Sequence, residues 1–243
     1  MKLFTTIFTY TNIETNVYTP KDENYHNNKT EFALHNGYRC INVWDWDDWN
    51  KIINIIKPKS KIYARLTKIK EITKQEANIF LNNYHIQNSC NGNFVNIGLY
   101  YDNELVQVMT FGKPRYNKKY EWELLRLCSH PDYIVVGGAE RLFKHFIKNY
   151  SPQSIISYCD TSKFTGNVYN KLGFILSTIN KPSKIWSKGK TYITDNLLRQ
   201  HGYDRLFKTN YGKGTNNEQL MIDHGWLSIY DCGQATYLYT KKG

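Results

Sequence analysis

The chain has 243 residues and no run of about 18 apolar residues, which excludes a predicted membrane-spanning helix. Its 32 lysines and arginines outnumber its 21 acidic residues, and the net charge of +11 favours an anionic partner, with nucleic acid as the first candidate. The five cysteines are scattered and never in a CxxC spacing, which excludes a cysteine-rich zinc site and predicts reduced thiols, as in a cytoplasmic protein.

The first stretch of the chain, residues 1–60, alternates short apolar runs with polar loops. The pattern predicts a strand over residues 4–10, a helix over residues 30–35 that ends at Asn36-Gly37, and a strand over residues 39–43. The acidic and aromatic segment 44–49 allows two interpretations. It is either a metal-binding cluster or, more simply, the start of a helix with Asp47 or Asp48 as its N-cap.

The middle stretch, residues 61–180, carries the strongest pattern of helices and strands. It predicts an amphipathic helix over residues 72–84, a hairpin over residues 94–111 with its turn at Asp102-Asn103, and a strand over residues 122–127. Gly137-Gly138-Ala139 then opens a helix that stops near residues 149–152, because Pro152 disfavours its continuation. A strand over residues 154–158, a short helix over residues 167–172 and a last strand follow.

The last stretch, residues 181–243, is basic and rich in aromatic residues. It predicts a basic loop, a helix over residues 197–207, a glycine-rich turn at residues 211–214, a helix over residues 217–224 and a terminal strand pair near residues 227–239. Basic groups interleaved with rings that can stack on bases indicate a nucleic-acid surface, while a solvated basic face is the alternative. The candidate contacts are Lys181, Lys184, Lys188, Lys190, Arg199, Arg205, Lys208 and Lys213, together with the basic residues of segment 57–74.

Three polar residues of the middle stretch are candidates for catalysis. Asp160 follows a buried strand at the edge where open α/β sheets bind ligands, so we expect it to be a base or to orient one; a cap on the next turn is the alternative. His85 ends a helix, where it would bind substrate or metal, or simply cap the helix. Glu123 would act as a base through a water molecule in a substrate cleft, or pair with Arg126 on the same strand.

The order of elements between residues 121 and 177 resembles the acyl-CoA-binding core of the GNAT superfamily of N-acetyltransferases. The resemblance covers about residues 62–180 and implies an α/β fold, with a mixed central sheet flanked by helices and a V-shaped split between parallel strands at residues 123–127 and 155–158. It also implies acetyl-CoA or another acyl-CoA as the donor, and Tyr169 of the Tyr-x-x-x-Gly-Phe segment beside the thioester sulfur. The implied donor-binding residues are Leu127 and Cys128 near the oxyanion and Val136, Gly137, Gly138, Ala139 and Arg141 at the pyrophosphate.

Three shorter segments, at residues 123–127, 157–161 and 166–169, look like the phage Mom family, whose members modify adenine in phage DNA. They are equally similar to the C-terminal domain of phage Hef-like homing endonucleases. This resemblance implies a phage-encoded protein in the host cytoplasm that modifies a base amine of DNA to evade restriction, with Asp160 in the mechanism and a metal ion as a possible cofactor. A base inside a duplex must be flipped out to be reached.

The same resemblance implies three consecutive domains. Residues 1–60 would be a truncated Vsr-like endonuclease module, which lacks the upstream metal-binding strands and so is expected to be inactive. Residues 61–180 would be the acyltransferase core, and residues 181–243 a basic extension that completes the fold and contacts DNA. Two other functions stay open: a catalytically silent DNA-binding or anti-defence protein on this scaffold, and an acetyltransferase for a protein or small amine. Both a monomer and a homodimer are compatible with the sequence.

Overall fold

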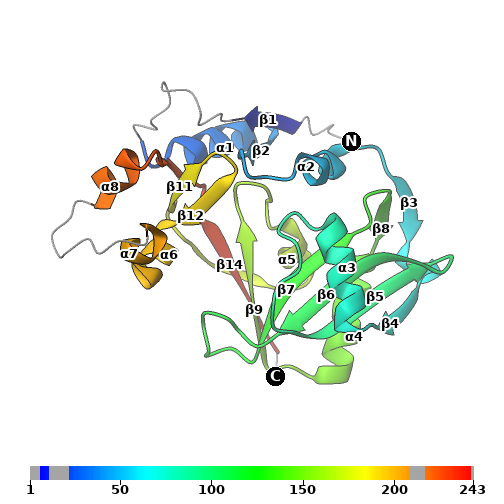
Figure 1. Cartoon of the computed structure of the whole chain (residues 1–243). Coiled ribbons are helices and arrows are strands. Elements are labelled where there is room, and N and C mark those ends of the chain that lie inside the picture. Colours follow the sequence, from blue (N-terminus) through cyan, green and yellow to red (C-terminus); the bar gives the residue numbers. More distant parts are fainter. Residues whose placement is uncertain (1–5, 11–21, 208–216, 242–243) are drawn as a thin grey trace. The chain divides into compact units, whose positions relative to one another are not determined.

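The structure is a computed structural model that describes residues 6–10, 22–207 and 217–241 (Figure 1). The chain divides into two compact units, each assembled from three separate stretches. Unit 1 comprises residues 1–47, 160–164 and 180–234, and unit 2 comprises residues 48–159, 165–179 and 235–243. This division differs from the three consecutive domains expected from the sequence, because a strand at the C-terminal end of the chain joins the sheet of unit 2.

Unit 2 is built on a seven-stranded mixed sheet, which confirms the predicted α/β class. The strands, in spatial order, are β10 (Ile175–Ile179), β14 (Gln234–Thr240), β9 (Ser154–Asp160), β7 (Trp122–Ser129), β6 (Glu104–Gly112), β5 (Asn93–Tyr101) and β4 (Lys68–Glu71). The strands β4 to β7 pair in antiparallel fashion, whereas β7 and β9 are parallel. Parallel pairing of neighbouring strands at these positions was the central prediction from the sequence, and it is confirmed.

Two helices cover this sheet, because alternate side chains of a strand point to opposite faces. Helix α4 (Gly138–Tyr150) packs Leu142, Phe143 and Phe146 into a core that includes Phe111 of β6. Helix α3 (Lys74–Tyr84) packs Ala77, Phe80 and Leu81 against Val108 of β6 and Cys128 of β7, in a separate cluster. Val108 and the next residue of β6, Met109, thus belong to different cores, as expected for a sheet covered on both faces.

The remaining elements of unit 2 are short. They are α2 (Trp49–Ile56), the parallel strands β3 (Ser60–Tyr63) and β8 (Tyr133–Val136), the 3-10 turn at Ala64–Leu66, and α5 (Asn167–Lys171). Asp48 caps α2 by accepting a hydrogen bond from the Asn50 amide, which confirms the simpler interpretation of the acidic segment. The predicted turn of the β5–β6 hairpin is confirmed as well, since Asp102 and Asn103 both adopt positive φ.

Unit 1 contains two small sheets and four helices among the residues that the structure describes. Strands β1 (Thr6–Tyr10) and β2 (Arg39–Val43) are parallel, and β12 (Thr191–Thr194), β11 (Lys184–Lys188) and β13 (Leu227–Tyr230) form an antiparallel sheet. The helices are α1 (Tyr25–His35), α6 (Asp195–His201), α7 (Tyr203–Phe207) and α8 (Asn217–Asp223). No helix in the described parts of the chain is long and apolar enough to cross a membrane.

Several predictions for this unit are wrong in detail. The helix expected over residues 197–207 is broken by Gly202, which adopts a φ of 75°. The two terminal strands do not pair with each other, because β13 joins β11 while β14 enters the sheet of unit 2. The basic loop after residue 181 contains the hairpin β11–β12. The expected glycine-rich turn at residues 211–214 lies outside the described residues.

Candidate active site

The sheet of unit 2 opens between β7 and β9. These strands pair only through Trp122 with Ile155 and Glu123 with Ile156, at the start of each strand. On its other edge β7 stays paired with β6 as far as Ser129. The edge of β7 that faces β9 is therefore free of strand pairing beyond Glu123, and this is the V-shaped split that the sequence predicted.

A bulge at Leu125 decides which side chains of β7 share a face. In the β6–β7 register Phe111 is opposite Leu124 and Thr110 is opposite Arg126, so Leu125 is one residue more than β6 can match. An extra residue shifts the alternation of side chains by one position. Glu123 and Arg126 thus share a face of β7. Burial lowers the pKa of Arg126, and the charge of Glu123, among others, opposes this only in part.

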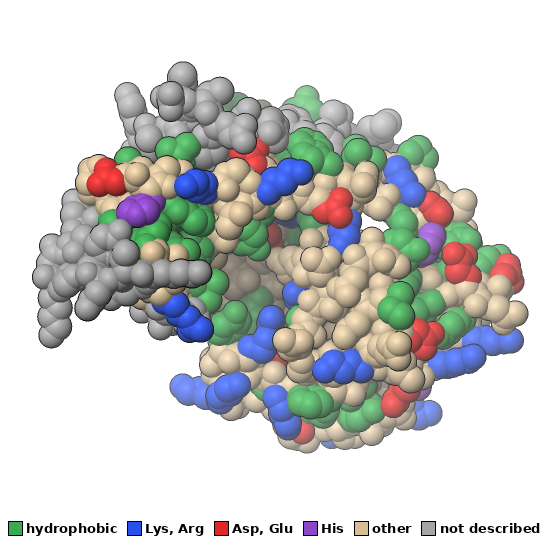
Figure 2. All heavy atoms as spheres, in the orientation of Figure 1, with side chains coloured by type: hydrophobic (Ala, Val, Ile, Leu, Met, Phe, Trp, Pro, Cys, Tyr) green, Lys and Arg blue, Asp and Glu red, His purple; other side chains and the backbone are tan. Residues whose placement is uncertain are grey.

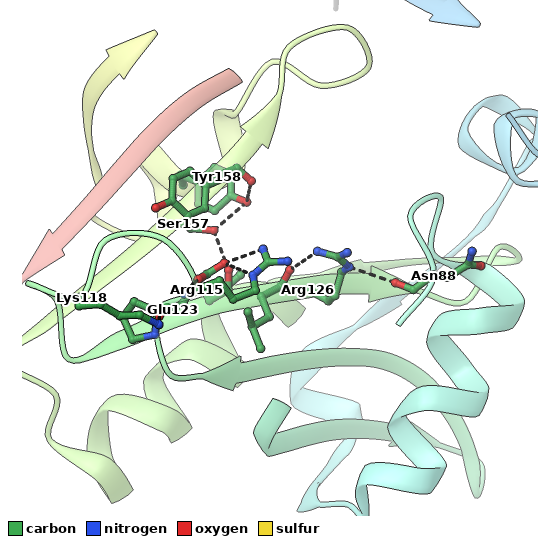
Figure 3. Close-up of polar contacts among 11 residues, drawn as sticks. Asn88, Arg115, Lys118, Glu123, Arg126, Ser157 and Tyr158 are labelled. Atoms are coloured by element: carbon green, nitrogen blue, oxygen red, sulfur yellow. Dashed lines mark hydrogen bonds and ion pairs between the residues drawn. The ribbon is translucent and has the colours of Figure 1, made fainter. Parts of the chain in front are cut away.

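Glu123 is fully buried and both of its carboxylate oxygens are engaged by Arg115. The Arg115 amide donates to Oε2 at 2.7 Å, and its guanidinium donates to Oε1 from Nε at 2.9 Å and from Nη2 at 2.6 Å. Burial lowers the pKa of Arg115, but the bonds to Glu123 outweigh it and the pKa is raised. Glu123 thus anchors the loop before β7, and Arg126 donates instead to the backbone carbonyls of Asn88 and Leu125 (Figure 3).

Hydroxyl groups from β9 and α5 meet inside the split. Ser157 Oγ donates to the Leu124 carbonyl of β7 at 2.8 Å and lies 3.1 Å from Tyr169 Oη, which is 3.3 Å from the Tyr158 carbonyl. Burial raises the pKa of Tyr169 to about 12, so this phenol keeps its proton at neutral pH. The Tyr169 hydroxyl donates to the Tyr158 carbonyl, and the Ser157 hydroxyl lies within donor distance of both the Leu124 carbonyl and Tyr169 Oη. The side chain of Tyr169 is fixed by stacking on Tyr237, with ring centroids 4.6 Å apart.

The predicted donor-binding turn lies at the start of α4. Gly137 is the N-cap, with a φ of 76° that favours glycine, and no side chain caps the helix. A Cβ on Gly138 would come within 2.0 Å of Gln107 Oε1, so a larger residue here would displace the Gln107 side chain. The first amides of a helix have no partner within it and attract anions. Nε of Arg141 is buried without a hydrogen-bond partner among the described residues.

The other predicted donor-binding residues lie around this turn and along the split. Val136 ends β8 and is exposed, and Ala139 is in the first turn of α4. Leu127 and Cys128 pair with β6 on one edge, and since successive amides of a strand point to opposite edges, one of these two amides points to the open side. The Cys128 thiol is buried on the α3 face, and burial raises its pKa to about 12, so it is not a nucleophile at neutral pH.

His85 is the C-cap of α3, which was the structural alternative for this residue. Its Nδ1 accepts a hydrogen bond from the Gln87 amide at 3.0 Å, which leaves the proton on Nε2. Burial, followed by the charges of Arg126 and Lys51, lowers the pKa of His85 to about 3. The imidazole is therefore neutral at physiological pH.

Asp160 is assigned to unit 1, and its Oδ1 accepts hydrogen bonds from the amide at 2.9 Å and the hydroxyl of Ser162. These contacts correspond to the turn cap that was the alternative for Asp160. Tyr169 belongs to unit 2. The expectation that the two residues serve one pocket stays a prediction, and it is tested by substitution below.

The candidate nucleic-acid contacts lie in unit 1. Lys181, Lys188, Lys190 and Arg205 are exposed, whereas Lys184 is half-buried and paired with Glu218 at 3.0 Å. Arg199 lies in α6, and Lys208 and Lys213 lie outside the described residues. Figure 2 shows lysine and arginine side chains spread over the visible face rather than gathered in one patch. DNA contact by these residues stays a prediction.

An aromatic stack accompanies these cations in unit 1. The ring of Trp44 stacks on Trp46 at 5.8 Å, and Trp46 stacks on Tyr192 at 4.8 Å. Lys163 Nζ lies 5.4 Å from the Trp44 ring, and Tyr192 at the other end is 51% exposed. The buried end of the stack, Trp44, therefore contacts a lysine, and the other end, Tyr192, has an accessible ring.

The described residues contain no group of three or more histidine, cysteine or acidic side chains placed to hold a metal ion. Asp47, one of the residues of the acidic segment, is instead paired with Lys163 at 2.7 Å. None of the five cysteines, all within the described residues, forms a disulfide. The metal-binding interpretation of residues 44–49 therefore has no support among these residues.

Sequence reasoning missed Arg115, Lys51 and Asn88, which surround the predicted residues of the split. Arg115 carries a signal that could have been used, because a buried glutamate needs a cation and the loop before β7 is basic. Asn88 adopts a φ of 57°, and nothing in its local sequence specifies which side chains it joins. Contacts of this kind depend on the tertiary structure.

Comparisons with known proteins give structural similarity only. No protein-family model matches the chain, and no curated protein matches it significantly. Among solved structures, an acetyltransferase of Bacillus subtilis in complex with CoA has 13% identity and a TM-score of 0.40 over 72% of this chain and 99% of that chain. A GNAT family acetyltransferase of Elizabethkingia anophelis with bound acetyl-CoA has 13% identity and a TM-score of 0.41, again over 72% and 99%.

An N-acetyltransferase of Staphylococcus aureus is similar at the same level, with 14% identity and a TM-score of 0.41 over 72% of this chain and 99% of that chain. Similarity this low identifies neither a reaction nor a substrate. The functional interpretation below rests on the contacts of the split, the glycine turn and the charges around them.

Proposed function

We propose that unit 2 transfers an acyl group from acyl-coenzyme A to an amine. The observation that carries this proposal is the split between β7 and β9, which holds a protonated Tyr169, together with a glycine turn at the start of α4 that packs on Gln107, the hydrogen-bond partner of Ser129 at the end of β7. The uncapped helix start and the partnerless Arg141 Nε fit a pyrophosphate, and the open edge at Leu127–Cys128 fits an acyl oxygen. Acyl-coenzyme A supplies the activated acyl group as a thioester.

The side chains of the split then have distinct tasks. Tyr169 holds its proton at Oη, where the Tyr158 carbonyl accepts it, because a phenol with a pKa of about 12 gives up a proton only reluctantly. During transfer this hydroxyl would turn from that carbonyl toward the leaving thiolate. Ser157 ties β9 to the Leu124 carbonyl and so fixes the width of the opening. Glu123 and Arg115 neutralise each other and hold the loop before β7 in place.

As the acceptor we propose an amine of DNA, in line with the Mom-like resemblance and its role in evading restriction. Two observations favour DNA: the net charge of +11 and the aromatic stack that ends at exposed Tyr192, with Lys188 and Lys190 on the same hairpin. Cations that neutralise phosphates and rings that stack on bases are the two components of single-strand binding.

The test combines transfer with product analysis. Full-length protein is incubated with acetyl-CoA and single-stranded DNA, the DNA is digested to nucleosides, and their masses are measured by mass spectrometry. We expect an acyl-sized mass increase on deoxyadenosine, which Tyr169→Phe should slow by about 10- to 1000-fold. Tyr150→Phe is the matched control, because the Tyr150 hydroxyl contacts Glu71 away from the split.

The other outcomes separate the alternatives. DNA that is bound but unmodified, with no thiol released in the presence of any amine, would favour a silent DNA-binding protein. Thiol release with small amines or protein, but not with DNA, would favour an ordinary acetyltransferase. Equal rates for Tyr169→Phe and Tyr150→Phe would remove Tyr169 from the mechanism.

A further inference from the structure

A pair of cations beside the split has neutral partners only. Lys51 of α2 is 7% exposed, and its Nζ donates to the Asn82 carbonyl at 2.6 Å and to Asn88 Oδ1. Arg126 of β7 donates from Nε to the carbonyl of the same Asn88 at 3.0 Å and from Nη1 to the Leu125 carbonyl at 2.8 Å. Asn88 therefore holds an ammonium with its side chain and a guanidinium with its backbone.

Neither cation forms an ion pair with a described residue. Of the nearby carboxylates, Glu123 spends both oxygens on Arg115, which lies between Glu123 and Arg126 in the row of side chains in Figure 3. His85 also faces the two cations, and it cannot balance them because it is neutral or positive; their charges add to the effect of burial in lowering its pKa to about 3. The cluster therefore carries an uncompensated positive charge.

An uncompensated charge in a partly desolvated place is costly and is normally balanced by a partner. Burial lowers the pKa of Arg126, as expected for a guanidinium removed in part from water. Its Nη2 has no hydrogen bond to a described residue, so this part of the guanidinium can bind a further group. Glu123 and Tyr169 are close enough to raise the pKa of Arg126, although burial lowers it more. A planar guanidinium binds carboxylates and phosphates through parallel hydrogen bonds.

We propose that Arg126, supported by Asn88 and Lys51, forms a subsite for an anionic group on the acceptor, a phosphate or a carboxylate close to the amine that is acylated. This inference deepens the proposed acyl transfer and rests on it, because an acceptor amine is bound only if that transfer takes place. Binding of the anion itself can be measured without any transfer. The bulge at Leu125 is what gives Arg126 this place, because it brings Arg126 near Glu123 at the start of the split.

The first experiment measures binding alone. Inorganic phosphate and acetate are titrated into the full-length protein without donor, and heat or chemical-shift changes give the dissociation constants. We expect Arg126→Gln to weaken the binding of at least one of the two anions by tenfold or more. Arg65→Gln, which removes an exposed arginine of unit 2 that lies over Tyr63, should change it less than twofold.

The second experiment measures transfer from acetyl-CoA to matched amines: phosphoethanolamine against ethanolamine, and glycine against glycinamide. We expect a tenfold or larger preference for the anionic member in kcat/KM, expressed mainly in KM, which Arg126→Gln abolishes and Arg65→Gln keeps. Arg126→Lys retains the charge without the planar fork and should be intermediate. The pair with the larger preference distinguishes phosphate from carboxylate.

The outcomes separate this inference from the proposed function. Anion binding that depends on Arg126, without acylation of any amine, would support the subsite and contradict acyl transfer. Acylation with the same preference in Arg126→Gln and Arg65→Gln would overturn the subsite and leave acyl transfer standing. If Arg126→Gln does not fold, as judged by circular dichroism, Arg126→Lys decides, and unchanged anion affinity in that variant would count against the subsite.

Discussion

Two buried lysines, one in each unit, are partnered in opposite ways. In unit 1 the side chain of Lys163 is 4% exposed, lies 2.7 Å from Asp47, and also donates to the Asn42 carbonyl. In unit 2 Lys51 is 7% exposed and is held by amide oxygens of Asn82 and Asn88. In a buried ion pair the two charges neutralise each other, whereas a buried cation with neutral partners keeps a net positive charge that can attract an anionic ligand. The first arrangement indicates structure, and the second indicates binding.

The largest effect should come from breaking the complete pair. Lys163→Met leaves the carboxylate of Asp47 buried without its cation, and removing one partner of a buried pair costs about 3–5 kcal/mol. Urea unfolding followed by tryptophan fluorescence measures this loss. Lys144→Met, which breaks the exposed pair with Glu140 on α4, is the matched control and should unfold as the wild type does. A loss below about 1 kcal/mol in Lys163→Met would mean that the pair is not structural.

Acidification should destabilise unit 1 through a buried histidine. His26 is fully buried beside Asn42, and burial, followed by the charge of Lys29, lowers its pKa to about 4 from 6.5. The unfolded chain binds a proton at His26 below pH 6.5 while the folded chain does not, so stability falls as the pH drops from 6.5 to about 4. The loss attributable to His26 is on the order of 3 kcal/mol.

His26→Gln should flatten this part of the stability profile relative to the wild type. Denaturant midpoints measured between pH 7.5 and pH 4 give the slope. His35→Gln changes an exposed histidine of the same helix α1 and serves as the control. An unchanged slope in His26→Gln would place the acid sensitivity elsewhere in the chain.

A smaller effect is expected where Asp160 caps the turn that carries Lys163. Asp160→Ala removes the acceptor for the Ser162 amide and should cost about 1 kcal/mol, as for a lost cap. Asp160→Asn retains an acceptor oxygen and should unfold nearly as the wild type does. If Asp160 is also the base, Asp160→Asn abolishes DNA modification, whereas full activity in a stable variant would leave Asp160 with the cap alone.

The smallest change in stability is expected in unit 2. Lys51→Met removes a buried charge that has no carboxylate partner, so the relief of desolvation offsets the lost hydrogen bonds, and the net change should stay within about 1 kcal/mol. Equilibrium unfolding beside Lys163→Met makes the comparison direct. A loss as large as that of Lys163→Met would show that the two lysines are equivalent and that Lys51 is structural.

The sequence predicted the sheet of unit 2 better than the small sheets of unit 1. The order of β7, the glycine turn, α4 and β9 follows from local signals: an apolar strand, two glycines, an amphipathic helix and a second apolar strand. The split between β7 and β9 was implied by the resemblance that this order carries. The partners of β13 and β14 do not, because pairing between strands far apart in the chain depends on the packing of the whole molecule.

The site shows the same limit. Tyr169 and the α4 turn are recognisable from residue order alone. The match of Arg115 with Glu123 depends instead on the path of the loop before β7, which is set by tertiary contacts. The contacts of Asn88 with Lys51 and Arg126 likewise could not be predicted from the sequence, because they join a helix, a turn and a strand from separate parts of the chain.

The place of β14 between β9 and β10 has a consequence for synthesis on the ribosome. Residues 161–240, eighty residues, are made after β9 and before its neighbour is complete. At about 5–20 residues per second this takes about 4–16 seconds. During that time β9, with its apolar Ile155 and Ile156, has an open edge that can pair with other chains. The yield of soluble protein should therefore depend on how fast this part of the message is translated.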